Sequence, residues 1–262
     1  MRDAAYYIDE RPVFMTLHPA LLCKGLTGFD AIFTMENNVR EFGGRLHPTH
    51  YRSNEYVRGI PVFCGGHARV HATAMIAACL GKQTPTLGFV GGAHKKRVTT
   101  LGEFRSGAVT YRDSYRERLL RIRDAKRPCT WRVAEGVPAR REILFHDSNN
   151  SQDDIRFVLW ESAREMWRRV ALVTNHYHVE RVRDMVSEMQ PAAGTHVYIT
   201  CVSAEETVLS LACNDARPRY WKIFDAAYAQ ETAHNRRKLE LRGREMLRNG
   251  TYRVSGENLA AS

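Results

Sequence analysis

The sequence has no long hydrophobic run. Nowhere in its 262 residues do about 18 or more apolar residues follow one another, which is roughly the length that a membrane-spanning helix needs. A secretion signal is also missing, because the N-terminal stretch MRDAAYYIDERPVF carries charges where a signal peptide needs an apolar segment. We therefore expect a soluble, cytoplasmic protein without a membrane span.

The six cysteines lack the C-x-x-C spacing, or any other spacing, that is typical of a metal site. They are Cys23, Cys64, Cys79, Cys129, Cys201 and Cys213. A chain this long without an export signal does not need a framework of disulfides to fold. We therefore predict reduced, buried thiols and no metal site.

The nucleotide-binding fingerprints G-x-G-x-x-G and Walker A are absent, so a classical NAD or ATP site is not predicted. Two Gly-Gly pairs stand in their place. Gly65 and Gly66 follow the apolar residues 60–64, and Gly91 and Gly92 follow residues 87–90. Without a Cβ, their N–H groups can approach a phosphate or carboxylate, which makes all four candidate ligand-binding residues. A tight turn is the alternative interpretation.

What the sequence does contain is a repeated order of strand, turn and helix, and its 44% apolar content allows a full core. The clearest unit covers residues 143–186. An apolar run at 143–145 and a polar loop precede a helix that is predicted from a capping box of Ser151 and Asp154 to about Arg169. Residues 170–173 are an uninterrupted apolar run, typical of a parallel strand covered on both faces, and a second polar loop follows it.

This order predicts one α/β domain spanning 1–262, a three-layer Rossmann-like fold with a mostly parallel sheet. We expect residues 62–64, 87–90, 171–173 and 197–202 to be strands of that sheet, and residues 29–35 to be a further early strand. Residues 220–248 are expected to be helical, with a mobile tail after Gly250.

A basic segment interrupts this pattern at residues 93–141, where 14 Lys and Arg face five Asp and Glu. The segment therefore carries +9 of the chain's net charge of +10, and we predict that it is an insertion projecting from the sheet. Within it, residues 111–126 are predicted to form an amphipathic helix with a basic face. That face is either a solvated surface or a patch for a polyanion or an acidic protein.

The polar loops at the two strand ends hold the candidate site, because open parallel sheets bind ligands where strands end and helices begin. The candidate catalytic residues are His178, Arg181 and Asp147. His178 and Arg181 lie three residues apart, which pairs an acid or base with a cation suited to phosphate or carboxylate. A structural histidine is the alternative. Asp147 is the better candidate acid, although a lone carboxylate predicts no metal site.

Hydroxyl and amide groups supply the candidate ligand contacts. They are Ser148, Asn150 and Ser151 in the first loop and Thr174 and Asn175 in the second. Thr174 and Asn175 either bind a ligand or end the strand and cap the next helix. We expect a right-handed crossover to bring the two loops together, with His178 and Arg181 over the mouth of a pocket that prefers anions, and with His176 exposed.

Two motifs in these loops resemble the SanA/ElyC/YdcF-like domain family. The family's first motif, S-x-N-T-x-E-N, is similar to SNNSQDD at 148–154, with Ser for Thr, Asp for Glu and Asp for the last Asn. Its second motif, V-T-S-x-Y-H-x-x-R, is similar to VTNHYHVER at 173–181 and differs only in Asn175. The resemblance implies a Rossmann-like domain of largely unsettled activity. Some family members act in the bacterial envelope, a role that does not carry over to a chain without a membrane segment.

Three functions fit these observations. One is a hydrolase or transferase acting on a phosphorylated or nucleotide-like small molecule, with His178 as general acid or base. Another is a binding module without turnover, for which the resemblance implies a possible S-adenosylmethionine or nucleotide site. The last is a scaffold that binds an acidic partner through the basic insertion.

Overall fold

The computed structural model of the 262-residue chain describes most of the domain and leaves gaps. The described residues are 7–8, 11–35, 39–42, 45–48, 54–57, 60–63, 65–80, 85–91, 141–145, 148, 150–194, 196–212, 214 and 216–252. Of the basic segment at 93–141, only Arg141 is among them, so the predicted insertion lies outside the described residues. The tail from 253 onward lies outside them as well.

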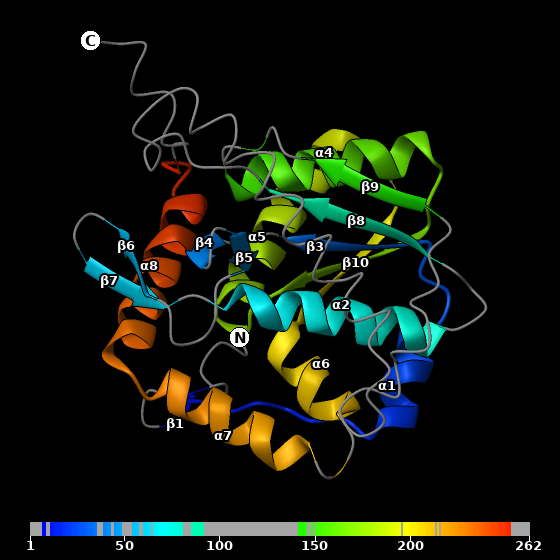
Figure 1. The fold of residues 1–262 in the computed structure, drawn as a ribbon. Helices are drawn as coiled ribbons and strands as arrows, with labels where there is room; N and C mark the ends of the chain where they lie inside the picture. The colour runs from blue at the N-terminus through cyan, green and yellow to red at the C-terminus, as the bar shows by residue number, and fades with distance from the viewer. Residues whose placement is uncertain are drawn as a thin grey trace.

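A five-stranded parallel sheet forms the centre of the protein (Figure 1). Its strands are β3 (Ala31–Met35), β8 (Thr86–Val90), β9 (Arg141–Phe145), β10 (Arg169–Thr174) and β11 (Tyr198–Ser203). They lie in the order β9-β8-β3-β10-β11, and each neighbouring pair is parallel. The first strand is thus in the middle, which is the doubly wound order of Rossmann-like folds. The α/β class and the predicted strands at 87–90, 171–173 and 197–202 are confirmed.

The central strands are apolar along their whole length because both faces of the sheet are covered. All five residues of β3 and of β8 are buried. Gly88 in the middle of β8 has a packing role, since a Cβ there would lie 2.1 Å from the ring of Phe33 on β3. The Phe33 ring can therefore lie against β8 only because residue 88 has no side chain.

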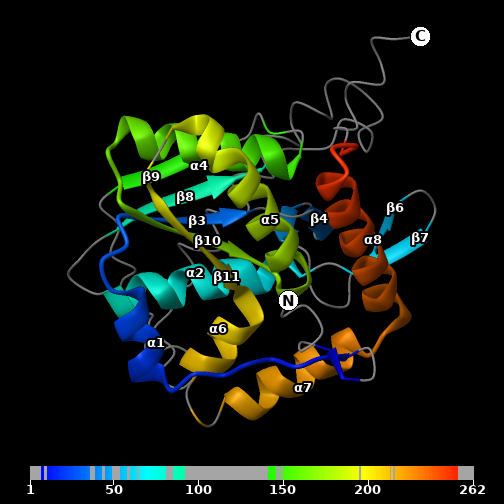
Figure 2. The ribbon, with the colours of Figure 1, turned by 180° about the vertical axis from the view of Figure 1, so that it is seen from behind.

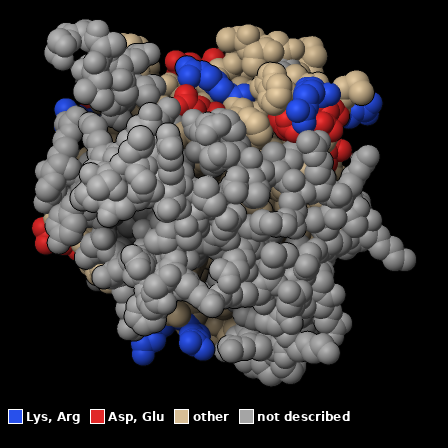
Figure 3. Space-filling model, turned by 45° about the horizontal axis from the view of Figure 1, so that its top comes forward, with Lys and Arg blue, Asp and Glu red and all other residues tan. Residues whose placement is uncertain are grey.

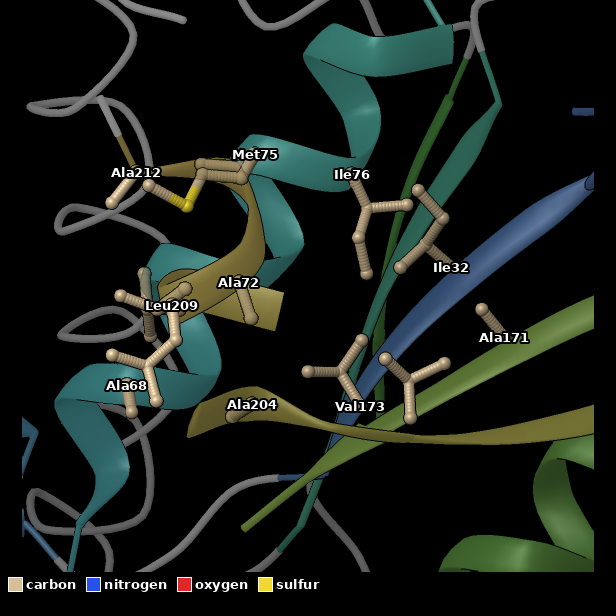
Figure 4. Packing of buried hydrophobic residues seen from close by; sticks show 14 of the residues in the cluster. Ile32, Ala68, Ala72, Met75, Ile76, Ala171, Val173, Ala204, Leu209 and Ala212 are labelled. Atoms are coloured by element: carbon tan, nitrogen blue, oxygen red, sulfur yellow. The ribbon is translucent and has the colours of Figure 1, made fainter. Parts of the chain in front are cut away.

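Helices cover both faces of the sheet, as the two opposite views show (Figures 1 and 2). They are α1 (Pro19–Leu26), α2 (Gly66–Leu80), α4 (Ser151–Arg164), α5 (His176–Ala193), α6 (Ala204–Leu211), α7 (Arg217–Tyr228) and α8 (Glu231–Arg248). One core cluster joins the sheet to α2, α6 and α7, and a second joins it to α4 and α5. Successive residues of β3 alternate between the two clusters, as the period of a strand requires. Figure 4 shows Ile32 and Val173 facing Ile76 and Ala72 of α2.

The prediction that residues 62–64 belong to the parallel sheet is wrong. Strand β7 (Ile60–Phe63) pairs antiparallel with β6 (Asn54–Val57) in a separate two-stranded sheet. Pro61 explains the difference, because proline lacks the N–H that a central strand donates and is confined to edge strands. A second hairpin, β4 (Val39–Phe42) with β5 (Arg45–Pro48), precedes it, and β1 (Tyr7–Ile8) pairs with β2 (Arg11–Pro12).

The boundaries of the central helices also differ from the prediction. Helix α4 ends at Arg164 rather than near Arg169, because Met166 turns the chain with a positive φ of 54°. The Asp30 carboxylate then accepts from the backbone N–H groups of Arg168 and Arg169, at 2.7 and 3.0 Å, and fixes the start of β10. The helical region after residue 217 is two helices, α7 and α8, with a break between Tyr228 and Glu231.

Charged side chains of both signs lie next to one another on the described part of the face in Figure 3. None of the helices in the described ranges is long and apolar enough to cross a membrane.

Candidate functional site

The doubly wound order creates a switch point between β3 and β10. The chain leaves β3 for β8 through α2 on one face of the sheet, and it leaves β10 for β11 through α5 on the other face. The carboxyl ends of the two strands, at Met35 and Thr174, are therefore neighbours from which the chain departs in opposite directions. Open α/β sheets bind ligands at such a point.

A hydrogen-bonded chain of three side chains lies at this edge of the sheet. The Ser151 hydroxyl is 3.2 Å from Nε2 of His178, and Nδ1 of His178 is 2.8 Å from Oε2 of Glu240. Ser151 begins helix α4, His178 lies in the first turn of α5, and Glu240 belongs to α8. The two polar loops thus meet in space, as the crossover predicts.

The protonation states of these three hydrogen-bonded residues follow from burial and charge. Burial lowers the pKa of His178 to about 4, with Arg181 adding to the effect and Glu240 opposing it. Burial alone would raise the pKa of Glu240, but Arg181 and His178 hold it at about 2. At neutral pH, His178 is therefore a neutral ring that donates from Nδ1 to the Glu240 carboxylate and accepts a hydrogen bond from the Ser151 hydroxyl at Nε2.

His178 is less accessible than predicted. Its residue is 5% exposed, so the expected position over the mouth of an open pocket is wrong. Helix α8 packs against α5 and covers the ring, and Glu240 of α8 binds one of the ring nitrogens directly. Ser151 is half-buried, so it is the one of these three hydrogen-bonded residues that a ligand can reach.

Arg181 is turned toward Glu240. Its Nε lies 3.0 Å from Glu240 Oε2 in an ion pair, and its side chain is 17% exposed. Gly243 of α8 permits this position, since a Cβ there would lie 2.9 Å from Cδ and Nη1 of Arg181. The positive charge of Arg181 therefore stabilises the ionised form of the Glu240 carboxylate.

Asn175 is a hydrogen-bonding centre in the protein interior. Its Oδ1 accepts from Nε of Arg69 at 2.5 Å and from the Tyr177 hydroxyl at 3.4 Å. Its Nδ2 donates to the Gly65 carbonyl at 3.0 Å and to Oε1 of Glu205 at 2.8 Å. Asn175 is completely buried, and these four bonds use its full capacity. Its side chain therefore joins α2, α5 and α6 and has no group left for a ligand.

Arg69 is a site residue that the sequence analysis missed. It is 3% exposed, and Nη1 donates to the carbonyl of Met35 at 2.6 Å, which places a cation at the carboxyl end of β3. A charged residue inside the apolar run of α2 was the available signal. Glu205 and Glu240 had no such signal, because helices α6 and α8 are distant in sequence and rich in charge.

The start of α4 lies one residue earlier than predicted. Asn150, not Ser151, is the N-cap, and its Oδ1 accepts from the N–H groups of Gln152 and Asp153 at 2.8 and 3.2 Å. Asp153 accepts from Asn150 Nδ2 at 2.9 Å, so the reciprocal cap pairs Asn150 with Asp153. An Asn side chain at this position reaches both amides, and Ser151 is left to contact His178. The two amides are not open to a ligand while Asn150 holds them.

Asp154, which was predicted to cap the helix, is buried beneath it instead. Burial raises its pKa to about 7, although the nearby Ser148 hydroxyl and the charge of Arg69 oppose the shift. Within the described part of the chain, Oδ1 of Asp154 and Oγ1 of Thr174 are buried without a hydrogen-bond partner. Ser148 itself is buried and donates to the Asn150 carbonyl at 2.8 Å.

Of the five remaining predicted residues, three glycines are described and buried, and two residues lie outside the described part of the protein. Gly65 and Gly66 are buried at the start of α2, beside Asn175. Gly91 is buried at the end of β8 with a φ of 157°. Asp147 and Gly92 lie outside the described residues. Over the ranges that the structure describes, no three His, Cys, Asp or Glu side chains are grouped so that they could hold a metal ion.

His176, which was expected to be exposed, has only 8% of its side chain accessible. Its ring packs edge-on against Phe14, with centroids 5.2 Å apart, and Nδ1 lies 3.7 Å from Oε1 of Glu206. Burial lowers the pKa of His176 to about 4 and raises that of Glu206 to about 7. Both residues line a cavity of about 190 Å³ between α5, α8 and β11.

Comparisons with protein-family models, with curated proteins and with solved structures gave no match for this chain. The resemblance of the two loop motifs to the SanA/ElyC/YdcF-like family is therefore a prediction that these comparisons do not test.

Proposed function

We propose that this protein is a SanA/ElyC/YdcF-like domain that binds a small anionic ligand, nucleotide-like or phosphorylated, at the carboxyl edge of its sheet. It acts on that ligand as a hydrolase or transferase, with His178 as general acid and base. In this proposal the domain has three layers and carries its basic insertion at 93–141. The observation that supports it best is the chain from Ser151 through His178 to Glu240 at the switch point.

Catalysis is supported by the state of His178. A general base must be unprotonated at neutral pH and within hydrogen-bond reach of the proton it removes. His178 satisfies both conditions, because it is neutral at pH 7 and Nε2 is 3.2 Å from the Ser151 hydroxyl; its lowered pKa of about 4 also makes it a weaker base than an exposed histidine. Glu240 fixes the tautomer with Nε2 free of hydrogen and would stabilise the imidazolium that forms when the proton moves.

Binding of an anion is supported by two cations at the same edge. Arg69 lies at the end of β3 and Arg181 in the second turn of α5, and both act electrostatically on His178. The N-termini of α4 and α5 add the positive ends of their helix dipoles. These charges favour a phosphate or carboxylate near Ser151.

A binding module without turnover is the second candidate, and the burial of His178 favours it. Both ring nitrogens already have partners and the residue is 5% exposed, as in a structural network. An S-adenosylmethionine or nucleotide site without chemistry would be consistent with that burial.

Thermal unfolding of the full chain against nucleotides, S-adenosylmethionine and sugar phosphates tests the proposal. A ligand that binds only the folded state raises the melting temperature, by about 2.7 kcal/mol of stability at 100-fold excess over its Kd. The Arg181→Ala variant should lose the shift that an anion produces. Arg183→Ala is the matched control, because Arg183 lies on the same helix but is 53% exposed and pairs with Glu180.

Product analysis by mass spectrometry then separates the enzyme from the binding module. The His178→Gln variant should keep the thermal shift and lose turnover of the ligand that binds. Absence of a shift with every anionic ligand would contradict the proposal. Equal turnover by wild type and His178→Gln would contradict the role of His178.

A further inference from the structure

We propose that Ser151 is a nucleophile that takes the acyl group of a small anionic carboxylic ester and forms a covalent ester with it. This inference rests on the proposed function and adds the bond that is broken, the class of substrate and the residue that attacks. Glu240 is a positioning residue that acts through His178.

The place of Ser151 in the fold suits a nucleophile. It is the first residue of α4, six residues beyond the end of β9, and its hydroxyl lies beside His178 at the carboxyl edge of the sheet. Ser151 is half-buried, whereas His178 and Glu240 are 5% and 4% exposed. A ligand therefore meets the hydroxyl before the buried base, whereas Glu240 also lines the cavity of about 190 Å³ between α5, α8 and β11.

Neighbouring hydroxyl groups are less suited to this role. Ser148 is 6% exposed and donates to the Asn150 carbonyl. Thr174 is completely buried. Ser203 also lies at the carboxyl edge, directly before α6, but its hydroxyl accepts from the N–H of Glu206 at 3.3 Å as an N-cap. Ser151 contacts a histidine because Asn150 performs the capping of α4 in its place.

The chemical step balances with water as the only co-reactant. The Ser151 Oγ attacks the ester carbonyl carbon while its proton moves to Nε2 of His178. The tetrahedral intermediate then expels the alcohol, which takes that proton from His178. Water, deprotonated by the same nitrogen, then attacks the acyl-serine. This second intermediate expels the Ser151 oxygen, which takes the proton back from His178, and the carboxylic acid is released.

An acyl group fits this arrangement better than a phosphoryl group. Attack on a carbonyl carbon needs a hydroxyl that loses its proton as the bond forms, which a neutral histidine held by a carboxylate provides. Phosphoryl transfer passes through a loose transition state with less demand for a base. The anionic part of the ester lies near the positive charges of Arg69 and Arg181, and the dipole of α4 favours the negative charge on the intermediate.

A fluorophosphonate probe, which phosphonylates activated serines, tests the inference on the full chain by peptide mapping. We expect one adduct, on Ser151, and none in Ser151→Ala. The His178→Gln variant should react about 10²- to 10⁴-fold more slowly, the range that a general base contributes. Glu240→Gln should slow the reaction less. Ser203 is the control within the same chain and should stay unmodified.

The acyl preference has its own readout. Incubation with p-nitrophenyl acetate should leave an acetyl group on Ser151, and p-nitrophenyl phosphate should leave none. Phosphorylation of Ser151 would overturn the acyl assignment. Failure of the folded wild type to react with the fluorophosphonate, or equal reaction of His178→Gln, would overturn the nucleophile. If anions still raise the melting temperature in that case, the proposed function stands without a covalent step. If Ser151 reacts but no anion binds, the ligand class is wrong instead.

Discussion

The two sides of the start of helix α5 carry similar residues in different arrangements. Toward α4 lies His178, and toward α6 lies His176, and burial lowers the pKa of each to about 4. The His178 ring has a hydroxyl on one nitrogen and a carboxylate on the other, at 3.2 and 2.8 Å. The Nδ1 of His176 lies 3.7 Å from Oε1 of Glu206, its backbone N–H donates to Oε2 of Glu205 at 2.7 Å, and its ring packs on Phe14.

Burial makes both rings neutral at pH 7, so burial alone does not distinguish a base from a packed aromatic ring. The carboxylates do. Arg181 and His178 hold the pKa of Glu240 at about 2, whereas burial raises the pKa of Glu206 to about 7. Near neutral pH the α4 side therefore has a fixed negative charge aligned with its histidine, and the α6 side has a carboxyl that titrates. The Glu240 carboxylate on the α4 side is therefore ionised and able to stabilise an imidazolium at every pH near neutrality.

Removing the carboxylate of Glu240 or of Glu206 should give the largest difference in unfolding free energy between the two sides. Glu240→Ala leaves His178 and Arg181 without their buried partner and should cost about 3–5 kcal/mol of unfolding free energy. Glu206→Ala loses a hydrogen bond from the Met15 N–H and should cost about 1 kcal/mol. Urea unfolding at pH 7 measures both. Glu245→Ala, on the exposed face of α8, is the control. Equal costs for Glu240 and Glu206 would contradict the comparison.

The next largest effect on unfolding free energy is expected when the titrating carboxyl on each side, Asp154 or Glu206, is replaced by its neutral amide. Between its ordinary pKa of 3.8 and its raised value of about 7, Asp154 is ionised in the unfolded chain and neutral in the folded one. Wild-type stability from this group therefore falls as the pH rises through that window. Asp154→Asn should match wild type below about pH 4 and exceed it above pH 7 by at most about 4 kcal/mol, at about 1.4 kcal/mol per pKa unit.

Glu206→Gln should show a smaller difference with the same sign, because the Glu206 side chain is 23% exposed and Asp154 is 5% exposed. Unfolding free energies at pH 4, 5.5 and 8 measure both variants. A Glu206→Gln difference larger than that of Asp154→Asn would mean that burial does not control the two pKa values as described.

Much of the fold was readable from the sequence because the central strands are continuous apolar runs followed by polar turns. Residues 170–173 predicted β10, and the turn formers after them predicted the start of α5. The strand at Ile60–Phe63 has the same local pattern but pairs antiparallel, since a short apolar run with Pro61 does not specify its partner. Pairing is a long-range property that local periodicity cannot supply.

The site was predicted in part for the same reason. The loops with Ser151 and His178 follow strands in the chain, so topology places them at one edge of the sheet. Glu240 is 62 residues beyond His178, on a helix whose many charges look alike in sequence, and only the packing of α8 on α5 selects it. Asn175 shows the converse, because its motif position suggested a ligand contact and its four hydrogen bonds are all internal.

The smallest effect tests whether Arg181 controls His178 through its position. Gly243→Ala should gain about 0.5–1 kcal/mol from helix preference, as Gly25→Ala in α1 should, where a Cβ meets nothing within 4 Å. At Gly243 the new methyl would lie 2.9 Å from the Arg181 side chain, which must then move away from Glu240. The weakened ion pair offsets the gain in stability from helix preference. Arg181 and Arg69 lower the pKa of His178 and Glu240 raises it, so a displaced Arg181 leaves His178 more basic. The pH midpoint for fluorophosphonate labelling of Ser151 should therefore rise by a fraction of a pH unit in Gly243→Ala and stay constant in Gly25→Ala. A midpoint that falls, or one that moves equally in both variants, would show that Arg181 does not set the basicity of His178.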